Sequence, residues 1–147
     1  MRNMSIKQIS VFLENRPGKL KEMTAVLAAH DIDMRALSLA ETKDFGIVRI
    51  IVDDAYDAAN VLKENGFVAS LTKVLAVEVE DIPGGLDKVL SYFANAQVNI
   101  EYMYAFTGIK NPGHAFMVFR VADTKAAEVK LAGMGLKIIS QDDLASI

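Results

Sequence analysis

Asn15-Arg16-Pro17-Gly18-Lys19-Leu20 has a similar segment later in the chain, with Pro, Gly and Leu at the same positions. Its counterpart, Asp81-Ile82-Pro83-Gly84-Gly85-Leu86, begins at position 81, a displacement of 66 residues from position 15. The same displacement carries Asp33-Met34 onto Asn99-Ile100. A fixed displacement between similar segments is typical of a repeated structural unit. The sequence therefore predicts two copies of one fold.

The repeat also predicts where the domains divide. Gly66-Phe67 corresponds to Gly135-Leu136 with a displacement of 69, so the second copy is about three residues longer, and we assign these to a turn at Lys110-Asn111-Pro112-Gly113. Only Leu71-Thr72-Lys73 lies between the copies, without a Pro-, Gly- or Ser-rich spacer. We therefore expect one domain at residues 5–72 and another at residues 73–147, docked closely to each other.

Hydrophobic periodicity predicts the elements of the first copy. Apolar residues alternate in the first strand and then recur at helical spacing after Pro17-Gly18. Asp53 or Asp54 is placed to cap a second helix, and Asn65-Gly66 to end it. The expected elements are a strand at about 6–14, a helix at roughly 17–30 with Pro17 near its first turn, strands at 34–41 and 46–53, a second helix, and a short strand at about 67–71.

The second copy repeats this order. Leu75, Val77 and Val79 indicate a strand, and the apolar residues from Leu86 to Ala94 form the strongest helical pattern in the chain. Strands are expected near 99–107 and 114–121, then a helix that opens at Asp123 or Thr124 and ends at Gly133 or Gly135, and a last strand at 137–139. Both copies read βαββαβ. The expected fold class is α+β, with two ferredoxin-like units whose antiparallel sheets carry helices on one face.

Composition excludes several classes of protein. The 147 residues carry a net charge of −3 and are 52% hydrophobic, with no cysteine and only two histidines. This is typical of a globular protein, and it gives no basic surface for nucleic acid and few ligands for a metal. No apolar run approaches the length of a membrane span. We expect a cytoplasmic protein with no metal, no cofactor, no nucleic-acid partner and no membrane partner.

The strands themselves suggest further association. Residues 47–52 and 115–121 are apolar on both faces, whereas a sheet with one face in water should alternate. Tyr102, Tyr104 and Phe106 gather on one side of another strand. We expect the two halves to share an interface and a second molecule or layer to cover part of the sheet. Ordinary core packing explains the same pattern.

The repeated strand–helix turn is the candidate binding site. The first turn of a helix leaves N–H groups without partners and carries partial positive charge, so it attracts a carboxylate. A free amino acid also needs an oxygen for its ammonium group, and Asn15 with Asp33, or Asp81 with Asn99, supplies one. Asn and Asp beside Pro-Gly equally well form turn hydrogen bonds and nothing else. The residues alone leave both interpretations open.

The two turns resemble those of the ACT domain family, and the resemblance covers residues 5–71 and 73–144. It rests on Asn15-Arg16-Pro17-Gly18-Lys19-Leu20 followed by Asp33-Met34, and on Asp81-Ile82-Pro83-Gly84-Gly85-Leu86 followed by Asn99-Ile100. The family implies side-by-side domain pairing into a continuous sheet, a homodimer, and binding of amino-acid effectors where domains meet. It implies that these residues contact the effector and that the chain regulates a metabolic enzyme or a regulator.

The chain departs from the serine-binding members of the family. They carry a histidine two residues before the position of Asn15, where this chain has Leu13, and an asparagine at the position of Asp33. The second copy has Val79 in place of that histidine. The sequence therefore does not indicate serine as the effector.

The sequence speaks against two other functions and leaves a third open. The sequence shows no set of residues that would support catalysis. His30 and His114 have no serine or cysteine motif beside them, and the anion-binding loop of acylphosphatases is absent. RNA binding would need aromatic residues on the central strands, and the first strand offers Ile9 and Val11. A protein–protein module with the same fold and no small ligand would expose the same apolar faces, and it stays open as the alternative.

Overall fold

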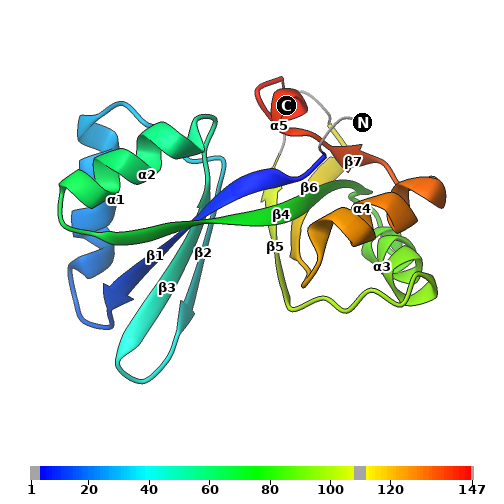
Figure 1. Cartoon of the computed structure of the whole chain (residues 1–147), viewed down its shortest axis with the longest axis horizontal. Coiled ribbons are helices and arrows are strands. Elements are labelled where there is room, and N and C mark those ends of the chain that lie inside the picture. The colour runs from blue at the N-terminus through cyan, green and yellow to red at the C-terminus, as the bar shows by residue number, and fades with distance from the viewer. Residues whose placement is uncertain (1–3, 108–111, 147) are drawn as a thin grey trace. The chain divides into compact units, whose positions relative to one another are not determined.

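The computed structural model describes residues 4–107 and 112–146 (Figure 1). Part of the turn predicted at residues 110–113 lies outside these residues. The described chain forms two compact units. Residues 7–72 form the N-terminal unit, and the described residues before residue 7 and after residue 72 form the C-terminal unit. The elements are β1 Ile6–Glu14, α1 Lys19–Ala29, β2 Ala36–Glu41, β3 Phe45–Ile51, α2 Ala55–Glu64, β4 Val68–Glu80, α3 Gly85–Asn95, β5 Tyr102–Thr107, β6 His114–Arg120, α4 Thr124–Gly133, β7 Ile138–Ile139 and α5 Gln141–Leu144.

The N-terminal unit is a sheet with two helices on one face (Figure 1). Its strand order is β4-β1-β3-β2, with β3 antiparallel to both β1 and β2. Alternate β1 residues such as Ile9 and Val11 are buried in a core shared with Met23 of α1 and Leu62 of α2. The period-two pattern of β1 and the helical pattern of α1 thus face the same apolar layer, as the sequence predicts.

The C-terminal unit has the corresponding order. Ala76 and Val77 of β4 pair with β6 on one edge and with β7 on the other, and β5 pairs antiparallel with β6. The order is therefore β7-β4-β6-β5. The core joins strand residues such as Val77 to Phe93 of α3 and Leu131 of α4, and Met4 packs against it. The predicted α+β fold with two βαββαβ units is confirmed.

The predicted break between the last strand of the first copy and the first strand of the second copy is wrong. We expected separate strands at 67–71 and around 75–79, but β4 runs without interruption from Val68 to Glu80. Its first part is the fourth strand of the N-terminal unit and its second part is the first strand of the C-terminal unit. Leu71-Thr72-Lys73 contains no Pro or Gly, and Thr favours strands, so nothing in these residues stops the extended backbone.

The helix starts require one correction. Asp54 and Asp123 cap α2 and α4, both within the expected pairs of residues. Helix α1, however, begins at Lys19 and not at residue 17, because Gly18 has a φ of 86° that no right-handed helix contains, and Pro17 lies just before it. The short helix α5 was not predicted. Its capping box, formed by Ser140 and Asp143, is the signal that marks it.

Candidate functional site

The two strand–helix turns have the same backbone. Gly18 and Gly84 each have a φ of 86°, a conformation that costs glycine little and other residues more. The amide of Asn15 donates to the Asp44 carbonyl at 3.0 Å, and the amide of Asp81 donates to the Gly113 carbonyl at 2.9 Å. Each turn is therefore fastened to the hairpin that follows it in its own unit.

Both helices that follow these turns begin without a side-chain cap among the described residues. Gly18 precedes α1 and Gly84 precedes α3, and neither helix start receives a side-chain hydrogen bond in the part of the chain that the structure describes. In contrast, Asp54 and Asp123 accept hydrogen bonds from the starts of α2 and α4. The amides of Lys19 and Gly85 donate to the carbonyls of Arg16 and Ile82 within the turns, so the N–H groups that follow them at the two helix starts are the ones available to an anion.

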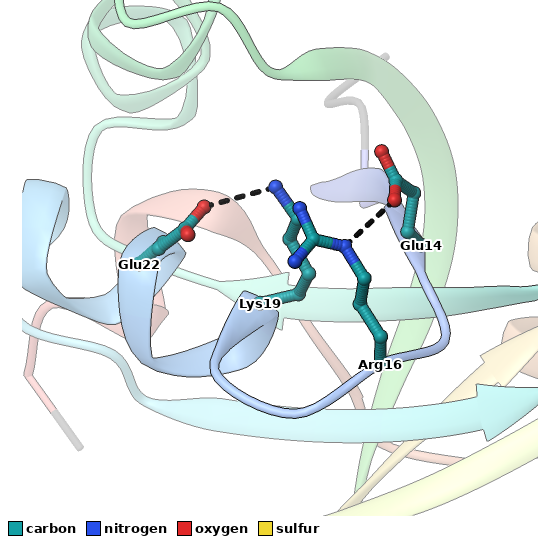
Figure 2. A network of polar contacts seen from close by, with 4 residues as sticks. All are labelled: Glu14, Arg16, Lys19 and Glu22. Atoms are coloured by element: carbon teal, nitrogen blue, oxygen red, sulfur yellow. Dashed lines mark hydrogen bonds and ion pairs between the residues drawn. The ribbon is translucent and has the colours of Figure 1, made fainter.

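A cavity of about 260 Å³ lies at the turn of the N-terminal unit. Three of its charged side chains, Glu14, Arg16 and Lys19, already form ion pairs within the protein, as Figure 2 shows. Arg16 Nε donates to Glu14 Oε2 at 2.8 Å, and Lys19 Nζ donates to Glu22 Oε2 at 3.2 Å. The lining residues are Leu13, Glu14, Asn15, Arg16, Lys19, Leu20, Leu39, Glu41 and Gly46.

Asn15 is also engaged within the protein. Its side-chain nitrogen, Nδ2, donates to Glu41 Oε2 at 3.2 Å and to the Thr42 carbonyl at 3.3 Å. Asn15 therefore ties the turn to the β2–β3 hairpin, and only its carbonyl oxygen is left to meet a ligand.

Glu14 is electrostatically stabilised as a carboxylate. The hydrogen bond from Arg16, then the positive charges of Arg16 and of Lys19, hold the pKa of Glu14 below its ordinary value. The charge of this carboxylate is thus compensated by the protein itself.

A larger cavity, of about 350 Å³, lies at the turn of the C-terminal unit. Its lining includes residues of α3 and Leu136, the residue after Gly135. Glu78 there forms an ion pair with Lys137, with Oε2 and Nζ 3.0 Å apart. The lining residues are Glu78, Glu80, Ile82, Pro83, Gly84, Gly85, Lys88, Val89, Tyr92 and Leu136.

Two charged side chains of this second cavity carry no ion pair or side-chain hydrogen bond within the described residues. Glu80 follows Val79 at the end of β4, and Lys88 stands on the second turn of α3, and both are exposed. The Tyr92 hydroxyl likewise has no bond to any described residue. The cavity therefore offers both signs of charge, beside the uncapped start of α3.

Gly85 brings α3 unusually close to the end of β4. A β carbon added to Gly85 would lie 2.0 Å from the carbonyl oxygen of Glu80, far inside van der Waals contact. The N-terminal unit has Lys19 at the corresponding position. Glycine is thus required at position 85 for the helix start to pack on this strand.

Asp33 and Asn99 are not beside their turns. Glu14 pairs with Phe45 at one end of the N-terminal sheet, whereas the Arg35 amide donates to the Ile51 carbonyl at the other end. Asp33 therefore lies at the opposite end of the unit from Asn15, about 17 Å away along β2. In the C-terminal unit, Asp81 is tied to Gly113 while the Glu101 amide donates to the Arg120 carbonyl, so Asn99 and Asp81 are separated in the same way.

The expectation that Asn15 and Asp33 of one copy meet around one ligand is therefore wrong for a single unit. The helix between them runs the length of the sheet, and this reversal carries Asp33 away from the turn. Met34 and Ile100 pack against the cores of their units. Eight residues that line the two cavities belong to the predicted set, namely Asn15, Arg16, Lys19, Leu20, Ile82, Pro83, Gly84 and Gly85. Pro17, Gly18, Asp81 and Leu86 belong to the turns but do not line the cavities.

Sequence reasoning missed several lining residues, among them Glu78, Glu80, Lys88 and Tyr92. The sequence did contain a signal for Lys88. In the repeat, displaced by 66 residues, Lys88 corresponds to Glu22, so the charge at this position is reversed between the two copies. Leu136 had no such signal, since only the folded unit brings it to the turn.

Metal centres and membrane spans are two further kinds of functional feature. Among residues 4–107 and 112–146, no group of three or more His, Asp or Glu side chains is placed to hold a metal ion. None of the described helices has the length and apolar character needed to cross a membrane.

Comparison with known proteins places this geometry in context. The model of a family described as ACT domain pair matches residues 4–147. The crystal structure of protein BT0572 from Bacteroides thetaiotaomicron is similar over 98% of both chains, with 38% identity and a TM-score of 0.88. No curated protein matches the chain.

Two further solved structures share the fold at low identity. The ligand-free regulatory subunit of aspartate kinase from Thermus thermophilus is 18% identical, with a TM-score of 0.63, over 88% of this chain and 90% of that one. The corresponding subunit from Thermus flavus is 16% identical, with a TM-score of 0.59, over 86% of this chain and 90% of that one.

Proposed function

The chain belongs to the ACT domain pair family, and from that premise we propose that it is a regulatory sensor that binds a free amino acid. The amino acid binds at a repeated strand–helix turn, where ACT domains meet, and the bound state alters a partner enzyme or regulator. The protein itself performs no catalysis. His30, one of its two histidines, is engaged with the Val26 carbonyl, with Nδ1 and the oxygen 2.9 Å apart.

The observation that carries this proposal is the pairing of an uncapped helix start with a cavity at both turns. An α-carboxylate placed there meets unpaired N–H groups and the positive end of the helix dipole. Cavities of about 260 and 350 Å³ are of the size that holds a small metabolite.

The proposal includes a homodimer. Asn15 and Asp33 lie at opposite ends of one unit, so they meet only if a second copy runs antiparallel alongside the first. A two-fold axis produces such a pairing, because it sets each end of one protomer beside the opposite end of its partner. Leu39 on the edge strand β2, 53% exposed, is available to such a contact.

Regulation follows if the amino acid favours one arrangement of the domains. A ligand shifts a conformational equilibrium only through different affinities for the two states. A partner that binds one arrangement then responds to the amino-acid concentration.

A thermal-shift screen of the twenty standard amino acids tests the proposal. A ligand at 100 times its dissociation constant should stabilise the folded state by about 2.7 kcal/mol and raise the melting temperature measurably. If no amino acid at 10 mM raises it, and calorimetry shows no heat of binding, the sensor role is excluded.

A second candidate is an assembly module without a small ligand. The exposure of large apolar side chains in the N-terminal unit favours it, with Phe12 47% and Phe45 54% exposed. Exposed apolar patches commonly mark protein interfaces. Sedimentation with and without amino acids separates the candidates, because a pure assembly module associates without responding to them.

A further inference from the structure

The two turns have the same backbone but opposite electrostatic states, and the repeat shows why. In the repeat, displaced by 66 residues, Glu14 corresponds to Glu80, Arg16 to Ile82, Lys19 to Gly85 and Glu22 to Lys88. The first set forms two ion pairs, Glu14 with Arg16 and Lys19 with Glu22. In the second set both cations are lost, the first carboxylate is kept, and the second carboxylate has become a lysine.

The polar and charged side chains at the N-terminal cavity therefore already have partners within the protein. Arg16 Nε and Glu14 Oε2 are 2.8 Å apart, and Lys19 Nζ and Glu22 Oε2 are 3.2 Å apart (Figure 2). The Asn15 side chain donates to Glu41. A zwitterion entering this cavity would have to displace these partners and would gain little in exchange.

Two charged side chains at the C-terminal cavity lack such partners among the described residues. Glu80 and Lys88 carry no ion pair to any residue that the structure describes, although both line one cavity of about 350 Å³. Glu78, mostly buried with 13% of its side chain exposed, adds a second carboxylate to this cavity. An ammonium group beside Glu80 and a carboxylate beside Lys88 and the start of α3 would supply the missing partners.

The apolar part of the lining indicates the side chain of the ligand. Ile82 stands where the N-terminal unit has Arg16, and it is 58% exposed. Val89 and Leu136 line the same cavity. An aliphatic side chain packed here would remove this apolar surface from water.

We infer that the amino acid binds in the C-terminal cavity and not in the N-terminal one, and that it is a neutral amino acid with an aliphatic side chain. This inference rests on the proposed function and assigns it to one of the two copies. In this arrangement Glu80 and Lys88 bind the α-ammonium and the α-carboxylate, and the ion pairs of the N-terminal unit occupy the equivalent space.

Calorimetry on the full chain tests the assignment, with L-leucine, L-isoleucine, L-valine and L-methionine as probes. Glu80→Gln and Lys88→Gln should each raise the dissociation constant by about ten-fold, since each removes a charge-assisted contact. The matched controls Glu14→Gln and Glu22→Gln change the equivalent positions of the N-terminal unit and should leave the dissociation constant within about two-fold.

A variant that gives Glu80 an ion-pair partner within the protein provides an independent test. Ile82→Arg restores the cation that the N-terminal unit carries at this position, so Glu80 should gain the partner that Glu14 has. We expect binding to be lost while the melting temperature of the ligand-free protein stays within a few degrees. Leucinol, which lacks the carboxylate, and 4-methylpentanoate, which lacks the ammonium group, should each bind at least about ten-fold more weakly than L-leucine.

The outcomes separate the two proposals. If an amino acid binds but the Glu14 and Glu22 variants weaken it as much as the Glu80 and Lys88 variants do, the assignment to one cavity is wrong and the sensor role stands. Binding of charged amino acids alone overturns the aliphatic class. If none of the twenty amino acids binds, both the proposed function and this inference are excluded.

Discussion

Asp31 and Gln97 hold the same left-handed backbone conformation, each with a φ of 56°, just past the ends of α1 and α3. Gly66 and Gly135 hold the corresponding positions after α2 and α4, with φ of 86° and 91°. At all four ends the same pair of backbone hydrogen bonds closes the helix, for example from the Ile32 amide to the Leu27 carbonyl at 2.9 Å. Two of the four helix ends therefore carry a residue with a β carbon where glycine fits better.

Replacing either residue with glycine should stabilise the protein. Asp31→Gly and Gln97→Gly should each raise the free energy of unfolding by about 0.5–1 kcal/mol, because the left-handed conformation costs a residue with a β carbon more than it costs glycine. Urea denaturation measures this change. Gly66→Ala is the control in the other direction and should destabilise the protein, and equal stability of all three variants would contradict the argument.

Gly85→Ala should destabilise the C-terminal unit. The new β carbon would collide with the Glu80 carbonyl, so α3 or the end of β4 must shift, at a cost of about 1–3 kcal/mol. Gly133→Ala is the matched control, because a β carbon there meets no described atom within 4 Å and alanine favours a helix. Thermal unfolding should show a lower melting temperature for the first variant and an unchanged or higher one for the second.

Asn15→Ala should weaken the junction between the turn and the β2–β3 hairpin. It removes the donor to Glu41 and to the Thr42 carbonyl, which should cost about 0.5–1.5 kcal/mol of unfolding free energy. Faster hydrogen exchange at the Thr42 amide would report the loosened hairpin. Asp81→Ala changes the equivalent side chain, which has no bond to the described residues, and should leave stability within about 0.5 kcal/mol.

Arg16→Gln should raise the pKa of Glu14 toward its ordinary value, because it removes the hydrogen bond and the Arg16 charge that lower this pKa. In the unaltered protein this depressed pKa contributes stability above the unfolded-state pKa, and the contribution is lost as the pH falls through the folded-state pKa. The difference in stability between the two proteins should therefore shrink below pH 4.5. An NMR titration of the Glu14 carboxyl carbon measures the shift, and Arg35→Gln, which removes the partner of Asp53, should not move it.

Periodicity predicted most elements because each buries one face against a local apolar layer. The strand predicted at 6–14 is β1, and the caps expected at Asp53 or Asp54 and at Asp123 or Thr124 are Asp54 and Asp123. Periodicity failed at residues 71–73, because the end of a strand depends on which neighbours pair with it and not only on its own residues. The ends of α1 and α3 likewise lacked the glycine that marks α2 and α4.

The sequence by itself determined that two copies of one βαββαβ unit follow each other, because the turn at Pro17-Gly18 and its counterpart at Pro83-Gly84 impose the same local backbone on each. It also contained the exchange of Glu22 for Lys88. Only the tertiary structure decided that Asp33 lies far from Asn15, and that Glu80, Lys88 and Leu136 line one cavity. Those relations depend on how strands and helices pack across long stretches of chain, and a local pattern of residues does not specify such distances.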